Sequence, residues 1–168
     1  MIKEKNGFTM MDLVMVIAIL SIFSVMAIPR LTSLHTVKLY GVANKLASDI
    51  QYAQQIAISK QIPCGISFNP GTDSYFVYEG AYSGPTTPKA TDPYTRGAFI
   101  VDYQSEAHYK GIDLASTSFG DRLEFDSLGR PYNSGGILTT SSEEVELQSG
   151  GETRKVLITP NTGAIRVQ

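Results

Sequence analysis

Asp12 is the residue of this chain best placed to do chemistry, because it is a lone carboxylate inside a strongly apolar segment. An ionisable group in such a segment needs a partner of opposite charge. A free amine on Phe8 would supply one, since residues four apart share one face of a helix and a helix N-terminus favours an anion. That amine exists only if the chain is cut after Gly7. A charge pair between Asp12 and Phe8 would therefore require processing after Gly7.

The layout around Gly7 differs from that of an ordinary secretory signal. Such a signal places its small-residue cleavage site after the apolar run, so cutting removes the run. Here a short polar segment with Lys3 and Lys5 leads to Gly7, and the apolar run comes after it. Cutting after Gly7 would keep the run as the N-terminus of the mature chain.

The apolar run from Phe8 to Ile28 reaches the length of about 20 residues that a membrane span needs. A carboxylate at the centre of such a span costs about 2.5–3.5 kcal/mol, whereas the strongly apolar residues from Leu13 to Ile28 return about 3–6 kcal/mol. We therefore predict that residues 8–29 form a transmembrane helix in spite of Asp12.

This segment resembles the class III leader of type IV pilins and type II secretion pseudopilins. The basic leader ends in Gly7, Phe8 is the first mature residue, Asp12 supplies the acid, and Pro29 ends the apolar run. The resemblance implies that a prepilin peptidase cuts after Gly7 and methylates the amine to give N-methylphenylalanine at Phe8. It also implies that Asp12 pairs with the amine of an adjacent subunit during assembly. The family normally has glutamate there, so the reach of Asp12 is one methylene shorter.

A second helical pattern follows Pro29, which we expect to bend the helix rather than end it. Apolar residues recur at steps of three and four with polar residues between them, which is typical of an amphipathic helix over residues 30–61. The helix should stop near Gln61, because the residue before Pro63 avoids the helical conformation. From Phe8 to Lys60 the rod would be about 80 Å long. The apolar positions are Leu39, Val42, Leu46, Ile50, Ala53 and Ala57, and the polar ones are Asn44, Lys45, Ser48, Asp49, Gln51 and Gln55.

The remainder of the chain is rich in strand and turn signals. The turn 69–73 separates two strands and predicts a hairpin, and the turn 160–163 predicts another. Residues 82–95 are rich in Pro, Thr and Gly and predict a surface loop. The predicted strands are 64–68, 75–78, 99–103, 123–125, 137–140, 145–148, 156–159 and 164–167.

Three further segments resemble the GspH/FimT group of minor pilins and pseudopilins. They are the helical stretch Val42–Ala53, the motif Phe125–Pro131 and the turn Pro160–Gly163. The resemblance implies an α+β, pilin-like fold: a long N-terminal helix, hydrophobic in its first half, packed on an antiparallel β-sheet head.

The resemblance also implies an organisation and a function. Residues 1–7 would be the leader peptide, residues 8–29 the transmembrane or filament-core helix, and residues 30–168 a periplasmic globular domain. The chain would be a single-pass protein of the bacterial inner membrane, with its N-terminus in the cytoplasm. It would enter a type II secretion pseudopilus or a type IV pilus, in protein secretion or pilus assembly. Its partners would be other pilin or pseudopilin subunits, the prepilin peptidase and an inner-membrane assembly platform.

The sequence gives little support for a catalytic site. His35 and His108 have no spacing typical of a metal site or a catalytic triad, so we expect no enzyme, no metal and no cofactor. Asn69, Thr72 and Asp73 could offer oxygen ligands to calcium, but turn chemistry accounts for them equally well. The lone cysteine, Cys64, opens an apolar strand and is predicted to be a buried thiol.

DNA uptake is the alternative function, because some members of the resembled group bind DNA through arginines near the C-terminus. Phosphate binding needs several cations on one face. Arg154, Lys155 and Arg166 are the candidates, and Arg122 and Arg130 could join them on one face. The Gly-Arg-x-Arg pattern of the DNA-binding members is Gly163-Ala164-Ile165-Arg166 here, so one arginine is absent. The part from Arg30 onward also has slightly more acidic than basic residues, which does not favour a nucleic-acid surface.

Overall fold

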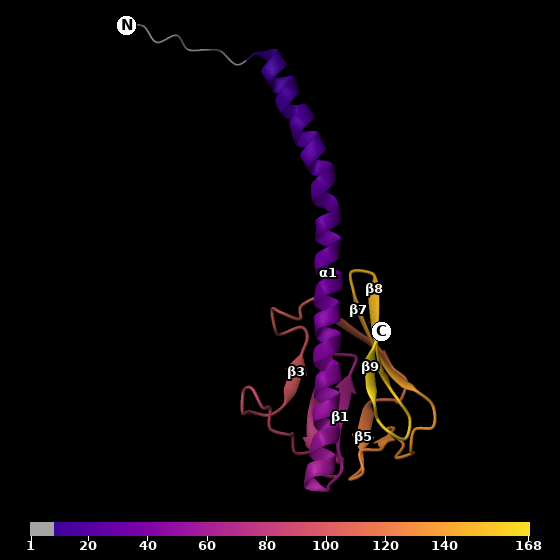
Figure 1. The fold of residues 1–168 in the computed structure, drawn as a ribbon. Coiled ribbons are helices and arrows are strands. Elements are labelled where there is room, and N and C mark those ends of the chain that lie inside the picture. Colours follow the sequence, from indigo (N-terminus) through magenta and orange to yellow (C-terminus); the bar gives the residue numbers. More distant parts are fainter. Residues whose placement is uncertain (1–8) are drawn as a thin grey trace.

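One long helix, α1 (Met10–Lys60), runs through most of the length of the molecule (Figure 1). The computed structural model describes residues 9–168, without the side chains of residues 25–34. α1 ends where the sequence predicts, with Gln61 in the left-handed conformation (φ 56°) as its C-cap and Pro63 just beyond. Position 29 lies inside α1, so the helix continues through it rather than ending there.

The strands that follow α1 form two antiparallel sheets, which make up the head. The first sheet has the strand order β3-β2-β1-β5-β6, and the second has the order β4-β7-β8-β9. The bounds are β1 (Cys64–Asn69), β2 (Ser74–Glu79), β3 (Ile100–Asp102), β4 (Asp113–Thr117), β5 (Arg122–Phe125), β6 (Pro131–Tyr132), β7 (Glu143–Ser149), β8 (Glu152–Ile158) and β9 (Ile165–Val167).

The core lies where the C-terminal half of α1 contacts both sheets, through β1, β2 and β5 of the first and β7, β8 and β9 of the second. The buried face of the helix carries the apolar positions that the helical period predicts, from Leu39 to Ala57. This arrangement is the predicted α+β fold, with a long helix packed on antiparallel sheet.

Both predicted hairpins are confirmed. β1 pairs with β2 from Cys64 opposite Glu79 to Asn69 opposite Ser74, and β8 pairs with β9 around the turn 160–163. The predicted loop 82–95 is irregular apart from isolated bridges, but Thr87 and Ala90 are buried, so the loop packs on the sheet in part.

One predicted strand differs from the structure, and two observed strands have no counterpart in the prediction. The predicted strand 137–140 is wrong, because only Leu138 makes a bridge there, to Tyr132, and Ile137 is exposed. Asn133 instead organises a turn, since its side-chain oxygen accepts hydrogen bonds from the backbone N–H groups of Gly135 and Ile137. β4 and β6 were not predicted.

Candidate assembly surface

The start of α1 uses Asp12 in a local contact that sequence reasoning missed. Asp12 Oδ2 accepts hydrogen bonds from the Thr9 backbone N–H (3.0 Å) and the Thr9 hydroxyl (2.9 Å), while Asp12 N–H donates to Thr9 Oγ1 (3.3 Å). This is a capping box with Thr9 as N-cap and Asp12 three positions later. The signal was present in the sequence as the spacing Thr-x-x-acid before an apolar run. Gly7 and Phe8 lie outside the described residues, so the predicted cleavage and amine pairing stay predictions.

The other oxygen of Asp12 matters for that pairing. Among residues 9–168, no hydrogen bond to Asp12 Oδ1 is formed, because both contacts from Thr9 go to Oδ2. A carboxylate has about four lone-pair sites. The cap therefore leaves acceptor capacity on Asp12 for a second donor.

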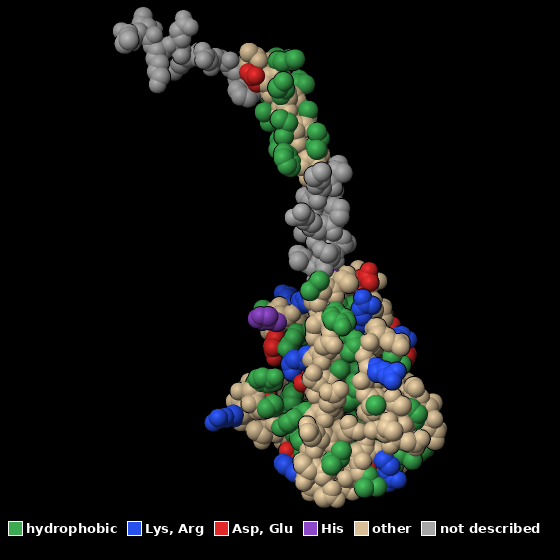
Figure 2. Space-filling model, viewed as in Figure 1, with side chains coloured by type: hydrophobic (Ala, Val, Ile, Leu, Met, Phe, Trp, Pro, Cys, Tyr) green, Lys and Arg blue, Asp and Glu red, His purple; other side chains and the backbone are tan. Residues whose placement is uncertain are grey.

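The N-terminal half of α1 presents apolar side chains on all sides. The large apolar residues from Met10 to Phe23 are all exposed, with fractions that range from 43% at Val16 to 83% at Met10. Figure 2 shows this hydrophobic surface along the visible side of the helix, away from the head. The hydroxyls of Ser21 and Ser24 donate to the carbonyls of Ile17 and Leu20 (each 2.9 Å), so their polarity is absorbed by the helix itself.

Such an apolar surface is far more continuous than a soluble monomer normally exposes. Within the stretches whose side chains the structure describes, no helical segment is both long and apolar enough to cross a membrane. The predicted span, residues 8–29, extends beyond the described stretch at both ends. Pro29 is among the residues whose side chains are not described.

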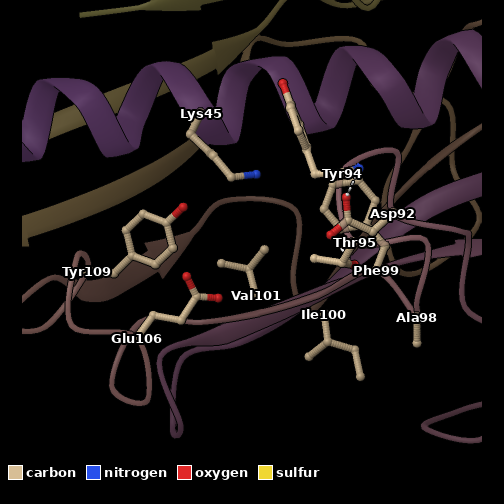
Figure 3. Close-up of a pocket in the computed structure, with 10 residues that line it drawn as sticks. All are labelled: Lys45, Asp92, Tyr94, Thr95, Ala98, Phe99, Ile100, Val101, Glu106 and Tyr109. Carbon is tan, nitrogen blue, oxygen red and sulfur yellow. Dashed lines mark hydrogen bonds between the residues drawn. The ribbon is translucent and has the colours of Figure 1, made fainter.

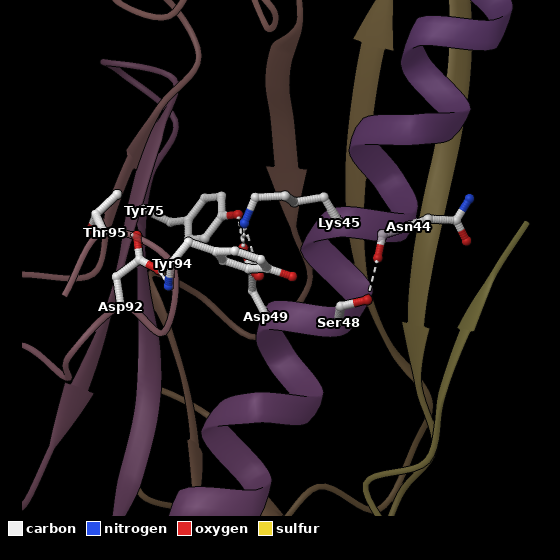
Figure 4. A network of polar contacts seen from close by, with 8 residues as sticks. All are labelled: Asn44, Lys45, Ser48, Asp49, Tyr75, Asp92, Tyr94 and Thr95. Carbon is white, nitrogen blue, oxygen red and sulfur yellow. Dashed lines mark hydrogen bonds and ion pairs between the residues drawn. The ribbon is translucent and has the colours of Figure 1, made fainter. Parts of the chain in front are cut away.

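The C-terminal half of α1 is fixed to the first sheet by a buried polar network (Figure 4). Asp49 is only 5% exposed, and its two oxygens hold Lys45 Nζ at 2.8 and 3.0 Å. The Tyr75 hydroxyl, from β2, donates to Asp49 Oδ2 at 2.5 Å. Burial raises the pKa of Asp49 above its usual range, although the hydrogen bonds from Lys45 and Tyr75 oppose this. Burial likewise raises the pKa of Tyr75 well above its usual value.

A second polar contact joins α1 to two loops that are distant in sequence. Gln54 Nε2 donates to the carbonyl of Gly129 at 2.8 Å and to the carbonyl of Thr162 at 2.9 Å. A Cβ added to Gly163 would lie 2.5 Å from Gln54 Nε2 and 2.9 Å from the Gly129 oxygen, so this close approach requires glycine. The helical stretch 42–57, the motif 125–131 and the turn 160–163 therefore meet at one point.

The motif 125–131 is itself a turn closed by Asp126. Its Oδ1 accepts hydrogen bonds from the backbone N–H groups of Leu128 (2.9 Å) and Arg130 (2.8 Å), and its Oδ2 pairs with the Arg130 guanidinium at 2.7 Å. Arg130 thus neutralises Asp126 in the turn and is engaged there as a structural partner.

A groove of about 370 Å³ lies between α1 and the loops that flank β3 (Figure 3). Lys45 comes from the helix, Asp92 and Tyr94 come from the loop before β3, and Glu106 and Tyr109 come from the turns after it. Phe99 and Val101 also line the groove. The lining combines aromatic and aliphatic side chains with two carboxylates and one ammonium group.

The candidate DNA-contact residues do not share one face of the second sheet. Arg154 and Lys155 are consecutive in β8, so their side chains leave opposite faces. Lys155 is paired with Glu144 (2.8 Å) and approaches Glu146 (3.9 Å). Arg166, which is exposed, lies opposite Leu157 and therefore on the face of Lys155. That face carries acidic as well as basic groups. Arg122, the remaining candidate, stacks on Tyr82 (4.4 Å to the ring centroid) and donates to the Ser134 carbonyl.

The other candidates have structural contacts. Asn69 Oδ1 accepts from Gly71 N–H, and Asp73 accepts from Leu114 N–H (2.9 Å) and Gln104 Nε2 (2.8 Å), so these calcium candidates hold turns together. Within residues 9–168, outside the side chains of 25–34, no three His, Cys, Asp or Glu residues gather as metal ligands. His35 packs on the β7–β8 turn at Gly150, whereas His108 lies in the turns after β3. Cys64 is a buried free thiol, as predicted.

Comparison with known proteins agrees with this architecture. Residues 42–163 match the family model described as Type II transport protein GspH. No curated protein matches the chain significantly. Among solved structures, the type IV minor pilin FimU of Pseudomonas aeruginosa superposes with a TM-score of 0.57 at 16% identity, over 79% of this chain and 90% of that one. The minor pseudopilin EpsH of the Vibrio cholerae Type 2 Secretion System superposes with a TM-score of 0.56 at 12% identity, over 78% and 96%.

The two solved structures share the fold, and the family model covers more than half of this chain, from the buried half of the helix to the β8–β9 turn. The chain is therefore a type IV pilin-like protein that belongs to the GspH family.

Proposed function

We propose that this chain is a minor pseudopilin or minor pilin, a structural subunit that enters a filament through its N-terminal helix. The observation that carries the proposal is the division of α1 into two halves. One half is buried in the head, and the other exposes apolar side chains around its whole circumference. The exposed half requires a cover that the head does not provide. Lipid would cover it before assembly, and the helices of sister subunits would cover it afterwards.

The exchange of lipid for sister helices gains little hydrophobic energy, because lipid tails are as apolar as the helix. Assembly must therefore depend on close packing and on polar pairing. Asp12 is the acidic residue of the described apolar half, and its Oδ1 is left available by the cap. We assign it to the amine of Phe8 on an adjacent subunit, exposed when the prepilin peptidase cuts after Gly7. The chain would then be an inner-membrane protein with a periplasmic head, extracted through the assembly platform.

The secretion pseudopilus is the machine we favour, because the matching family is named for type II transport. The type IV pilus remains the second machine, supported by the likeness to FimU. DNA uptake is the alternative role, and it gains little from the geometry, since Arg154 and Lys155 leave opposite faces of β8. A role in DNA uptake predicts that the purified chain retards duplex DNA in a gel at low salt and no longer binds it at high salt.

Mass analysis tests the processing step directly. The chain is expressed with and without a prepilin peptidase, beside a Gly7→Ala variant as matched control. We expect a mature chain that begins at methylated Phe8 only when peptidase and Gly7 are both present. An uncut chain, or a cut beyond Ile28, would contradict the proposal.

A second test addresses Asp12. Cross-linking of the processed chain to co-expressed pilin subunits should fall strongly in Asp12→Ala and less in Asp12→Glu, which keeps the charge. Equal cross-linking in all three proteins would remove Asp12 from the assembly mechanism and leave processing unaffected.

A further inference from the structure

The lining of the groove beside β3 carries more negative than positive charge. Asp92 and Glu106 bring two carboxylates to its lining, against the single ammonium of Lys45. In the part of the chain whose side chains are described, Glu106 forms no ion pair and no side-chain hydrogen bond. Figure 3 shows Lys45 reaching down from the helix and Glu106 on the opposite side of the same space.

Lys45 does not neutralise Asp92 and Glu106, because its ammonium group is already paired with Asp49. Its Nζ is held by both oxygens of Asp49, at 2.8 and 3.0 Å, and lies 5.4 Å from the centre of the Phe99 ring. The one ammonium group of Lys45 therefore stands against three carboxylates, those of Asp49, Asp92 and Glu106, so the net charge of the four groups is negative. A cation entering the groove would meet Glu106 and Asp92 without having to displace Lys45.

The walls around these carboxylates suit an organic cation. Tyr94 and Tyr109 present aromatic rings, whose faces attract ammonium and guanidinium groups, while Phe99 lies buried at the floor. Tyr94 is 86% exposed, so its ring is free to cover a bound side chain. The Phe99 ring is held 5.7 Å from the Tyr52 ring, and the Tyr52 hydroxyl donates to the Thr91 carbonyl at 3.0 Å, which ties the floor of the groove to α1.

Asp92 is also held in place as an anion. Its oxygens accept hydrogen bonds from the Tyr94 backbone N–H and the Thr95 hydroxyl, both at 2.8 Å. Burial would raise the pKa of Asp92, but these hydrogen bonds outweigh it and lower the pKa below its usual value. The negative charge is therefore built into the loop before any ligand binds.

We infer that this groove is a docking site for a basic side chain, arginine or lysine, flanked by an apolar residue in a segment of a different partner protein. The basic group would lie between Glu106 and the ring of Tyr109, and the apolar neighbour would pack on the exposed ring of Tyr94. The volume of about 370 Å³ is within the usual range for a small ligand site. The inference uses only the head and does not depend on filament assembly.

The test uses the full chain in a nonionic detergent and a labelled peptide, followed by fluorescence anisotropy. The probe is Ala-Leu-Arg-Leu-Ala with blocked ends. Its analogues carry citrulline, which has the shape of arginine without the charge, or glutamate in place of arginine. We expect the arginine peptide to bind more tightly than either analogue. Glu106→Gln should weaken it about fivefold, the upper end for an exposed charge pair, and Tyr94→Ala should weaken it as well.

Glu152→Gln is the matched control, because it removes an exposed carboxylate from β8 in the other sheet, and it should leave binding unchanged. Equal binding of the citrulline peptide, or equal loss in Glu106→Gln and Glu152→Gln, would overturn the proposal. Tighter binding of the glutamate peptide would assign the groove to anions through Lys45 instead. If the chain self-associates and Glu106→Gln abolishes this, the occupant of the groove is a second copy of this chain. That result would overturn the proposal that the occupant is a different partner protein.

Discussion

Replacing Ile50 by alanine should destabilise the head far more than the same replacement at Ile17. Both residues lie in α1, so the change in intrinsic helix propensity is the same at both sites. Ile50 is fully buried in the core, whereas Ile17 is 57% exposed. The difference between the two variants therefore isolates the packing of the helix on the sheets.

The expected size follows from the atoms removed. Isoleucine to alanine deletes three buried carbon groups at about 0.8 kcal/mol each, and the cavity left behind adds to this, giving about 3 kcal/mol. For a head of this size that is a fall in Tm of about 10 °C. Ile17→Ala should change the stability of the head by less than about 0.5 kcal/mol.

The assay is thermal unfolding of the full chain in nonionic detergent, followed by near-ultraviolet circular dichroism. The chain has no tryptophan and nine tyrosines, so the buried Tyr75 and Tyr103 report on the packing of the head. An equal fall in Tm for both variants would refute the division of α1 into a packed half and an exposed half. A small effect of Ile50→Ala would refute the proposed core.

Three further predictions concern the head and use the same assay. Gly65→Ala should cost about 1–3 kcal/mol by overpacking, because the new Cβ would lie 2.5 Å from the Tyr78 hydroxyl and also against the Leu123 carbonyl. Asp49→Ala should cost about 2–4 kcal/mol by stranding its buried partners, less than a fully enclosed pair because Lys45 is partly exposed, and Asp49→Asn should cost less because it keeps an acceptor. Burial would raise the pKa of Asp126, but hydrogen bonds from the turn outweigh this and lower the pKa. The stability lost in Asp126→Asn should therefore be full at neutral pH and shrink as the pH falls below 3.8 toward the lowered pKa. A difference that grew in acid would contradict that sign.

The elements predicted correctly from the sequence are those with local signals. The end of α1 follows from Pro63, and the two hairpins follow from the turns 69–73 and 160–163. In each case the residues that decide the structure are neighbours in the chain. The periodic core face of α1 is also local, since it depends only on a spacing of three and four.

The missed elements depend on partners far away in sequence. β4 buries only Leu114, so it carries no alternating pattern, and its existence depends on pairing with β7. β6 is two residues long and begins with Pro131. Asp49 belongs to the polar positions of the helix pattern, yet it is buried, because Tyr75 from β2 supplies a donor that the helix alone cannot reveal. The groove beside β3 likewise joins α1 to segments 92–109.

The predicted leader motif and the family match are independent of each other, and both favour the same class of protein. The family match spans residues 42–163, so neither the leader motif nor the exposed apolar half of α1 contributes to it. The matched region begins in the buried half of α1 and ends at the turn that Gln54 contacts through Thr162. The matched region is thus the packed head, in which the Gln54 side chain donates hydrogen bonds to Gly129 after β5 and to Thr162 after β8. Neither feature requires the other, because the head does not determine which segment precedes it and a leader motif does not determine which head follows it. A leader motif and a head of this family in one chain, with the exposed apolar half of α1 between them, are what we expect of the filament subunit proposed above.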